Sequence, residues 1–249
     1  MAIVRPFKAI RPTRDKASLV ASRSYLSYSE ETLKEKLENN PFTFLHIINP
    51  DYNKDKKLKG TNKFIATKEK FNEFKKNNIF ITEKEKAFYV YQQKTKNHIY
   101  TGLIASTSVD DYINNKIKKH EKTLIKREKM FSQYLSTIGF NAEPVLLFHK
   151  KNNIAENIIN LYLKKRSEYE FATTNQAIHK LWIIDDEKDI KAIEKSFEEI
   201  DTLYIADGHH RSASSTLLSK NNDFRNSQYF MSYLINENQL NIISFNRLI

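Results

Sequence analysis

The sequence predicts an α/β (α+β) fold in which helices surround a mixed sheet. Helical and extended patterns alternate along almost the whole chain, and no Gly/Ser-rich or Pro-rich linker separates them, which is typical of closely packed α/β architecture. The 249 residues are 40% hydrophobic and 12% aromatic, enough to form one large domain or two small ones. Because the elements become shorter after Pro144, we expect two regions, 1–143 and 144–249, or one intertwined domain.

The first region contains a helix with clear start and stop signals. Ser27–Glu30 has the capping-box pattern of a helix start. Pro41 ends this helix, because proline cannot continue it and biases the preceding residue away from helical angles. Phe71 and Phe74 share one face of a second expected helix. The elements expected after the first helix are an extended run at 43–48, a helix at 67–77, and strands at 87–93 and 99–105 that form a hairpin.

A long helical tract is expected after the hairpin, from Val109 to Leu135. The lysine-rich segment Lys116–Thr123 is the place where this tract can divide into two pieces. Gly139 is a suitable C-cap near its end. Ser108–Asp111 is an ordinary helix start, and we prefer this interpretation to a metal site at its two aspartates.

Shorter elements alternate after Pro144. A short apolar strand, Leu203–Ala206, leads directly into Asp207–Arg211, and a helix continues from there to Ser219. The other expected elements are extended runs at 145–149, 181–184, 229–235 and 240–245 and helices at 155–165 and 187–197.

The charge balance favours anionic partners. The chain has 41 Lys plus Arg against 30 Asp plus Glu, a net charge of +11, which suits nucleotides, nucleic acid or phosphorylated metabolites. The absence of cysteine excludes disulfides, thiolate metal sites and cysteine nucleophiles. No segment approaches the roughly twenty apolar residues of a membrane-spanning helix, and the first residues lack the apolar stretch of a signal peptide. We therefore expect a cytoplasmic protein.

The segment Asp207–Arg211, Asp-Gly-His-His-Arg, is the strongest candidate for a functional site. Gly208 is one of four glycines and falls where a strand turns into a helix, a place where positive φ is useful. Such a turn directs backbone N–H groups and the positive end of the helix at a ligand, which predicts an anion site. Arg211 supplies a planar fork for phosphate or carboxylate, and Asp207 is suited to bind Mg²⁺ or orient a histidine.

Two other interpretations of this segment stay open. Asp207 can be a simple helix cap with polar surface histidines behind it, although capping alone does not explain the adjacent Gly, two His and Arg. A zinc site at His209 and His210 is weakly supported, because neighbouring histidines rarely both reach one ion and no Cys or His-x-x-x-His pattern accompanies them.

A second candidate is the adjacent pair His120–Glu121. A carboxylate beside an imidazole suits acid/base chemistry. The alternative is a solvated, lysine-rich helix with ordinary Glu–Lys pairs across Lys116–Arg127. The remaining histidines are isolated and fit core or surface positions better than catalysis; they are His46, His98, His149 and His179.

Several blocks of the sequence resemble the prokaryotic family called domain of unknown function 1015. They occur in the family's order and span nearly the whole chain. The blocks are Arg5–Pro12, Pro41–His46 with Ile47, Ile48 and Pro50 after it, Thr101–Ala105, Val109–Tyr112, Ile117–Thr123 and Tyr204–Arg211. The resemblance implies a further C-terminal portion beyond Ile249. It also exposes a departure, because Met130-Phe131 stands where the family often has an Asp-Arg pair.

The His-Glu and Asp-Gly-His-His-Arg motifs together are similar to those of the ParB/sulfiredoxin-like free-serine kinases, at a greater separation. This resemblance implies a ParB/sulfiredoxin-like core, with Mg²⁺ and ATP or ADP as cofactors and a small hydroxyl metabolite such as serine as substrate. It implies the following roles: Glu121 as general base, Asp207 and His210 as further catalytic residues with Asp207 on Mg²⁺, and Gly208, His209, Arg211 and His120 at the phosphates or nucleotide.

Three functions compete on these motifs. The first is nucleotide-dependent phosphorylation of the metabolite hydroxyl, which needs chiefly positioning, Mg²⁺ and cationic groups. The second is a ParB-like module that binds nucleotide or nucleic acid without metabolite chemistry; the +11 charge suits it, but no helix-turn-helix pattern accompanies it. The third is a phosphate-ester hydrolase.

Overall fold

The protein has a mixed α/β architecture around one large sheet. The structure is a computed structural model and describes residues 2–24, 27–54, 56–220 and 227–241. The strands are β1 (Val4–Arg5), β2 (Ile10–Pro12), β3 (Phe80–Thr82), β4 (Phe88–Lys94), β5 (Ile99–Ser108), β6 (Ile117–Lys118), β7 (Val145–His149), β8 (Tyr169–Ala172), β9 (Ile178–Ile184), β10 (Leu203–Asp207) and β11 (Tyr229–Asn236). The helices are α1 (Ala17–Val20), α2 (Glu30–Asn39), α3 (Leu45–Ile48), α4 (Gly60–Lys76), α5 (Val109–Ile113), α6 (Ile125–Ile138), α7 (Asn153–Leu163), α8 (Glu187–Glu198) and α9 (His209–Ser219), with a 3₁₀ turn, η2, at Glu237–Gln239.

The order of strands in the large sheet brings distant parts of the chain together. The order is β6-β10-β7-β11-β5-β4-β9-β8, and β1 pairs with the end of β5. Among the described residues, β6–β10 and β7–β11 are parallel pairs and the other neighbours are antiparallel. Strands from before and after residue 144 are thus intermixed in one sheet, and the division expected there does not separate them.

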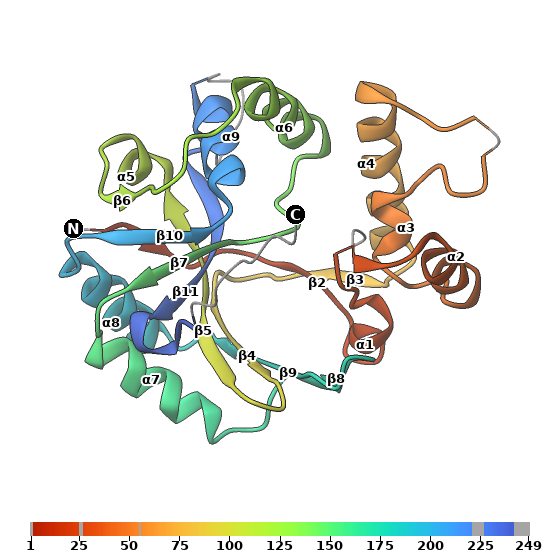
Figure 1. Cartoon of the computed structure of the whole chain (residues 1–249). Helices are drawn as coiled ribbons and strands as arrows, with labels where there is room; N and C mark the ends of the chain where they lie inside the picture. The colour runs from red at the N-terminus through yellow and green to blue at the C-terminus, as the bar shows by residue number, and fades with distance from the viewer. Residues whose placement is uncertain (1, 25–26, 55, 221–226, 242–249) are drawn as a thin grey trace, which may run out of the picture.

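Helices cover the sheet on two sides (Figure 1). In that view α5, α6 and α9 lie above the β10–β7 part of the sheet, and α7 and α8 lie below it. The main core fills the space between these layers, with Phe88, Leu147, Phe197 and Phe230 almost fully buried. The site described below lies where β10 enters α9.

A smaller unit stands beside the sheet and contains β2, β3 and α1–α4 (Figure 1). Its core is a group of aromatic and aliphatic side chains, and Phe140 from the end of α6 joins it. The rings of Phe71 and Phe140 stack with centroids 3.9 Å apart. The shared face expected for Phe71 and Phe74 is confirmed, because both are buried.

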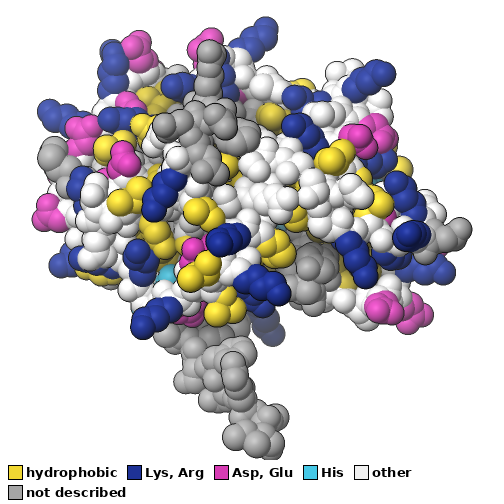
Figure 2. All heavy atoms as spheres, turned by 90° about the horizontal axis from the view of Figure 1, so that it is seen from above, with side chains coloured by type: hydrophobic (Ala, Val, Ile, Leu, Met, Phe, Trp, Pro, Cys, Tyr) yellow, Lys and Arg dark blue, Asp and Glu magenta, His cyan; other side chains and the backbone are white. Residues whose placement is uncertain are grey.

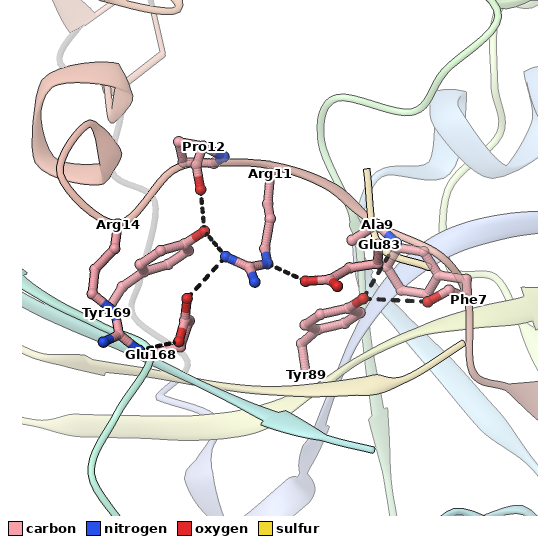
Figure 3. Close-up of polar contacts among 9 residues, drawn as sticks. All are labelled: Phe7, Ala9, Arg11, Pro12, Arg14, Glu83, Tyr89, Glu168 and Tyr169. Atoms are coloured by element: carbon pink, nitrogen blue, oxygen red, sulfur yellow. Dashed lines mark hydrogen bonds and ion pairs between the residues drawn. The ribbon is translucent and has the colours of Figure 1, made fainter. Parts of the chain in front are cut away.

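Arg11 on β2 connects this unit to the edge of the large sheet (Figure 3). Its guanidinium donates to Glu168 at 3.0 Å and to the hydroxyl of Tyr169 at 2.6 Å, and its Nε donates to Glu83. The hydroxyl of Tyr169 donates in turn to the carbonyl oxygen of Pro12. Glu83 follows β3 of the smaller unit, whereas Tyr169 lies on β8 at the edge of the large sheet, so these bonds fix the two units against each other.

Two expectations about the N-terminal elements are wrong. Residues 43–48 are not extended: Leu45–Ile48 is one helical turn with Leu45 and Ile47 fully buried. A short apolar run does not distinguish a buried helical turn from a strand, and packing onto the aromatic core decides it. The cap of α2 is Ser29, whose hydroxyl accepts from Thr32 N–H, rather than the expected Ser27.

The tract expected as a long helix is divided. It forms α5, the short strand β6, a loop and α6, which ends at Gly139 with φ of 80°. The Gly139 cap is therefore confirmed. His120 and Glu121 lie in the loop between β6 and α6, so the lysine-rich helix considered for them is wrong. Pairing of Ile117 with Leu203 places this segment at the sheet edge and overrides its helical pattern.

Other boundaries differ by smaller amounts. The hairpin of β4 and β5, the strands β7, β10 and β11, and the helices α7, α8 and α9 are present as expected, whereas α4 begins at Gly60 instead of residue 67. Strand β8 was not expected, and β9 begins three residues earlier than its apolar run. The strand expected at 240–245 lies largely outside the described residues. None of the helices in the described ranges is long and apolar enough to span a membrane.

Candidate functional site

The Asp207–Arg211 segment forms the strand-to-helix turn that its sequence predicts. Leu203 and Ile205 are fully buried and fix β10 in the sheet, and α9 begins at His209. Gly208 between them has φ of 101°, a conformation that residues with a side chain rarely adopt. A Cβ placed there would lie 3.2 Å from the Arg211 guanidinium carbon and 3.2 Å from the Cα of Val145. Glycine is thus required both by the turn and by the close packing around it.

Arg211 folds back over this turn. Its guanidinium donates to Asp207 at 2.5 Å and to the carbonyl oxygen of Pro144, and lies 3.7 Å from Glu143. The Asp207 and Glu143 side chains are 72% and 70% exposed, whereas that of Arg211 is 26% exposed. The Arg211 side chain is therefore fixed by the carbonyl oxygen of Pro144, while its two carboxylate partners are exposed to solvent.

Strand pairing carries His120 and Glu121 to the same turn. Strand β6 runs parallel to β10, with Lys118 opposite Tyr204. Continuing this register places His120 level with Ala206 and Glu121 level with Asp207. The observed contacts agree with this placement. The Glu121 carboxylate lies 3.6 Å from Nδ1 of His209, and the rings of His120 and His209 pack edge to face with their centroids 4.4 Å apart.

His209 is the buried member of this group. Its side chain is 5% exposed, whereas that of Glu121 is 64% exposed. The backbone N–H of His120 approaches Nε2 of His209 at 3.5 Å, a long hydrogen bond. Burial lowers the pKa of His209, the neighbouring His120 lowers it further, and Glu121 and Asp207 oppose this change. His209 is therefore neutral near pH 7.

Among the described residues, His210 is not a member of the group formed by His120, Glu121 and His209. Its Nδ1 is buried and has no hydrogen-bond partner among the described residues, and its carbonyl oxygen accepts from the hydroxyl of Ser214. The two adjacent histidines of the motif are therefore in different environments, as expected for consecutive residues on a helix.

One group in the described part of the chain has the arrangement of a metal site. Ligand atoms of His120, Glu121 and His209 all lie within 4.8 Å of one another. Asp207, which the sequence nominated for metal, is instead paired with Arg211 and is not a member of this group. Asp110 and Asp111 serve the local structure, since Asp110 follows the Ser108 cap and Asp111 accepts from Ile3 N–H at 2.6 Å.

Sequence reasoning missed the loop before β7. Glu143 and the carbonyl of Pro144 both contact Arg211, and Val145 restricts the space at Gly208. The sequence carried only part of this information. Pro144 stands immediately before an apolar run, which places it at the start of a strand but does not indicate its contact with Arg211.

A groove of 1140 Å³ lies between the large sheet and the smaller unit. Aromatic rings and cations line it, among them Phe7, Phe80, Tyr89 and Lys8, and so does the loop 139–142. The next residues of that loop, Glu143 and Pro144, are those that contact Arg211. Neither Glu121 nor the Asp207–Arg211 turn lines the groove, which is linked to the turn through this loop.

The lysines and arginines do not gather on one face in the view from above the α6–α9 side. Figure 2 shows them dispersed across the surface and interspersed with Asp and Glu. In this view the positive charge therefore forms no continuous track for a nucleic-acid backbone.

The comparisons with known proteins give a family but no functional relative. No curated protein and no solved structure matches the chain. The sequence profile of a protein family of unknown function, DUF1015, matches residues 4–249. The match spans nearly the whole chain and includes both His120–Glu121 and Asp207–Arg211. The protein is therefore a member of the DUF1015 family.

Proposed function

We propose that the protein is a nucleotide-dependent kinase that phosphorylates the hydroxyl of a small metabolite such as free serine. The observation that carries this proposal is the meeting of Glu121 with the Asp207–Arg211 turn, with Glu121 3.6 Å from His209. These residues come from two motifs that resemble the paired motifs of ParB/sulfiredoxin-like free-serine kinases. A ParB/sulfiredoxin-like core belongs to the same proposal.

The turn supplies the phosphate end of the proposed site. Gly208 provides the positive φ of the turn, and it makes no side-chain cap bond to α9, so the first N–H groups of this helix are suited to an anion. Arg211 offers a charged fork that is already fixed by Pro144. Asp207 is 72% exposed and gives only its Oδ2 to Arg211, so its other oxygen suits Mg²⁺, a cation that prefers oxygen ligands. When bound, Mg²⁺ would neutralise charge on the transferred phosphate.

Glu121 is the proposed general base. Its carboxylate is exposed beside the turn, where it can accept the proton of a substrate hydroxyl. The hydroxyl oxygen then forms a bond to the terminal phosphorus of ATP or ADP, and the bond between that phosphorus and the bridging oxygen breaks. The shortened nucleotide leaves, and the proton stays on Glu121. Buried His209 lies beside the Glu121 carboxylate, and the groove lined by the loop 139–142 has room for a nucleotide.

The experiment is a phosphoryl-transfer assay with product identification. The full chain is incubated with Mg²⁺, ATP or ADP and a panel of hydroxyl amino acids, and phosphorylated products are identified by phosphorus NMR and mass spectrometry. We expect a phosphorylated amino acid in the wild type and a loss of at least about a hundredfold in Glu121→Gln, as for removal of a general base. The control is Glu31→Gln, which makes the same change at an exposed position on α2.

The alternative functions give different results in the same preparation. Release of inorganic phosphate from esters without a phosphorylated acceptor would identify a hydrolase. Binding of DNA that weakens steeply with salt, survives Glu121→Gln and falls with Arg211→Ala would identify a binding module. Absence of any phosphorylated amino acid from a folded wild-type protein overturns the kinase proposal.

A further inference from the structure

We infer that His120, Glu121 and His209 form a binding site for a first-row transition metal of the Zn²⁺ class. This inference goes beyond the proposed kinase and concerns a different ion from the Mg²⁺ assigned to Asp207. It rests on the convergence of two imidazoles and one carboxylate from two segments, with all ligand atoms within 4.8 Å of one another.

The ligand types favour zinc-like ions over magnesium. Imidazole nitrogen suits Zn²⁺, Cu²⁺, Ni²⁺ and Fe²⁺, whereas Mg²⁺ prefers an all-oxygen shell. Two histidines and a glutamate are also a ligand set that zinc uses with a fourth position left for water. The set combines groups that are far apart in sequence, since His120 and His209 are separated by 89 residues.

The spacing of the best-defined pair fits one shared ion. Two ligands that are each about 2.1 Å from one ion at a tetrahedral angle are about 3.4 Å apart. The Glu121 carboxylate and His209 Nδ1 are 3.6 Å apart, which is longer than a good hydrogen bond. The distance thus suits an ion between the two atoms better than a proton.

Metal binding at Nδ1 would change one existing contact. Neutral His209 would then carry its proton on Nε2, which faces the backbone N–H of His120 at 3.5 Å. That hydrogen bond is at the long limit and contributes little, whereas metal–imidazole bonds are strong. The loop that carries His120 and Glu121 lies outside any helix or strand, so a small shift can relieve the contact and turn the His120 ring toward the ion.

The test measures metal binding alone, without nucleotide. Untagged protein is first freed of metal with a chelator and then titrated with Zn²⁺ by calorimetry. We expect one ion per chain, and affinity lower by at least about tenfold in both His120→Ala and Glu121→Gln, the scale on which even residues behind the ligands act. Mg²⁺ in excess should not displace Zn²⁺. Both side chains are exposed, so circular dichroism should show that these variants remain folded.

His98→Ala is the matched control. It removes a histidine from the turn between β4 and β5, outside the cluster, and should leave Zn²⁺ affinity unchanged. If the wild type binds no Zn²⁺ in a one-to-one ratio, or if His98→Ala weakens binding as much as the cluster variants, the inference is overturned and only adventitious surface chelation remains.

Cobalt gives a second readout that a purely structural role would not affect. Co²⁺ bound in place of Zn²⁺ should give visible absorption bands characteristic of nitrogen and oxygen ligands, and these bands should be lost in His120→Ala. Because the metal-binding assay contains no nucleotide and the kinase assay contains Mg²⁺ but no added Zn²⁺, either proposal can fail while the other stands. If both are correct, Zn²⁺ should inhibit phosphoryl transfer by occupying Glu121.

Discussion

Arg11 and Arg211 make similar bonds in opposite settings. Each donates to a carboxylate and to a further oxygen, but Arg11 is 14% exposed and its carboxylate partners are 23% and 19% exposed. The partners of Arg211 are 72% and 70% exposed. A closed group of charges must stay paired because water cannot replace a lost partner. A solvent-exposed group of charges can exchange a partner for a ligand. We therefore expect Arg11 to stabilise the fold and Arg211 to bind an anionic ligand.

Replacement of Arg11 should have the largest effect on stability. Arg11→Met leaves Glu83 and Glu168 without their shared cation, and we expect the free energy of unfolding to fall by about 3 kcal/mol. Urea denaturation measures this change. The control is Arg14→Met, which breaks a bond to the same Glu168 from a side chain that is 58% exposed and should cost less than about 1 kcal/mol. Equal losses in the two variants would contradict the contrast between closed and open charges.

Gly208→Ala should cost less stability but should disturb the site directly. Its φ of 101° and the contact with Arg211 at 3.2 Å predict a loss of about 2 kcal/mol. Because the added methyl displaces the Arg211 guanidinium, the rate of phosphoryl transfer should fall even under conditions in which the variant is fully folded. Gly139→Ala is the control, since it has φ of 80° in open space and should cost about 1 kcal/mol without affecting transfer. Identical activities in the two variants would mean that Gly208 serves the turn alone.

Acidification should lower the free energy of unfolding through His149, by less than Gly208→Ala does. This side chain is 5% exposed, and burial lowers its pKa from the usual value of 6.5 despite a bond to the carbonyl of Lys150. The unfolded chain therefore binds a proton that the folded chain rejects between the two pKa values. Stability is fully present above about pH 6.5 and declines as pH falls toward the folded pKa.

Thermal melts of the wild type and His149→Gln from pH 8 to pH 5 measure this effect. His46 and His179 also have pKa values that burial lowers, so the wild type should weaken through several groups. The difference between the two proteins isolates His149: the variant should lose less stability on acidification. A pH dependence unchanged by the substitution would show that the pKa of His149 is the same in the folded and unfolded chains, and would contradict this prediction.

Arg211→Lys should have the smallest effect on stability. It keeps the charge but loses the fork, and exposed pairs such as Arg211–Asp207 contribute less than about 1 kcal/mol. A point charge does not reproduce two parallel bonds to phosphate, so phosphoryl transfer should fall by about tenfold or more while the unfolding curve hardly moves. A loss of stability as large as that of Arg11→Met would place Arg211 among the structural arginines.

Sequence patterns predicted the elements with strong local signals and missed those set by pairing. The hairpin of β4 and β5 and the Gly139 cap followed from alternation and glycine. Residues 117–118 have a helical pattern but form β6 because β10 is their neighbour. Strand β8 escaped notice because its alternation is short and because, in the part of the chain that the structure describes, it pairs with β9 alone.

The same division applies to the candidate site. The sequence by itself determined the turn at Asp207–Arg211, because an apolar strand, a glycine and a helix start are local features that specify backbone geometry. It also supplied His120 and Glu121 as a chemically suitable pair. Only the tertiary structure decided that Glu121 meets His209, that Asp207 pairs with Arg211, and that the possible metal ligands come from both motifs. The Asp207–Arg211 pair is local, four residues apart, whereas the contacts of His120 and Glu121 with His209 depend on the parallel pairing of β6 with β10. That pairing joins residues far apart in the chain, so no local sequence pattern predicts it.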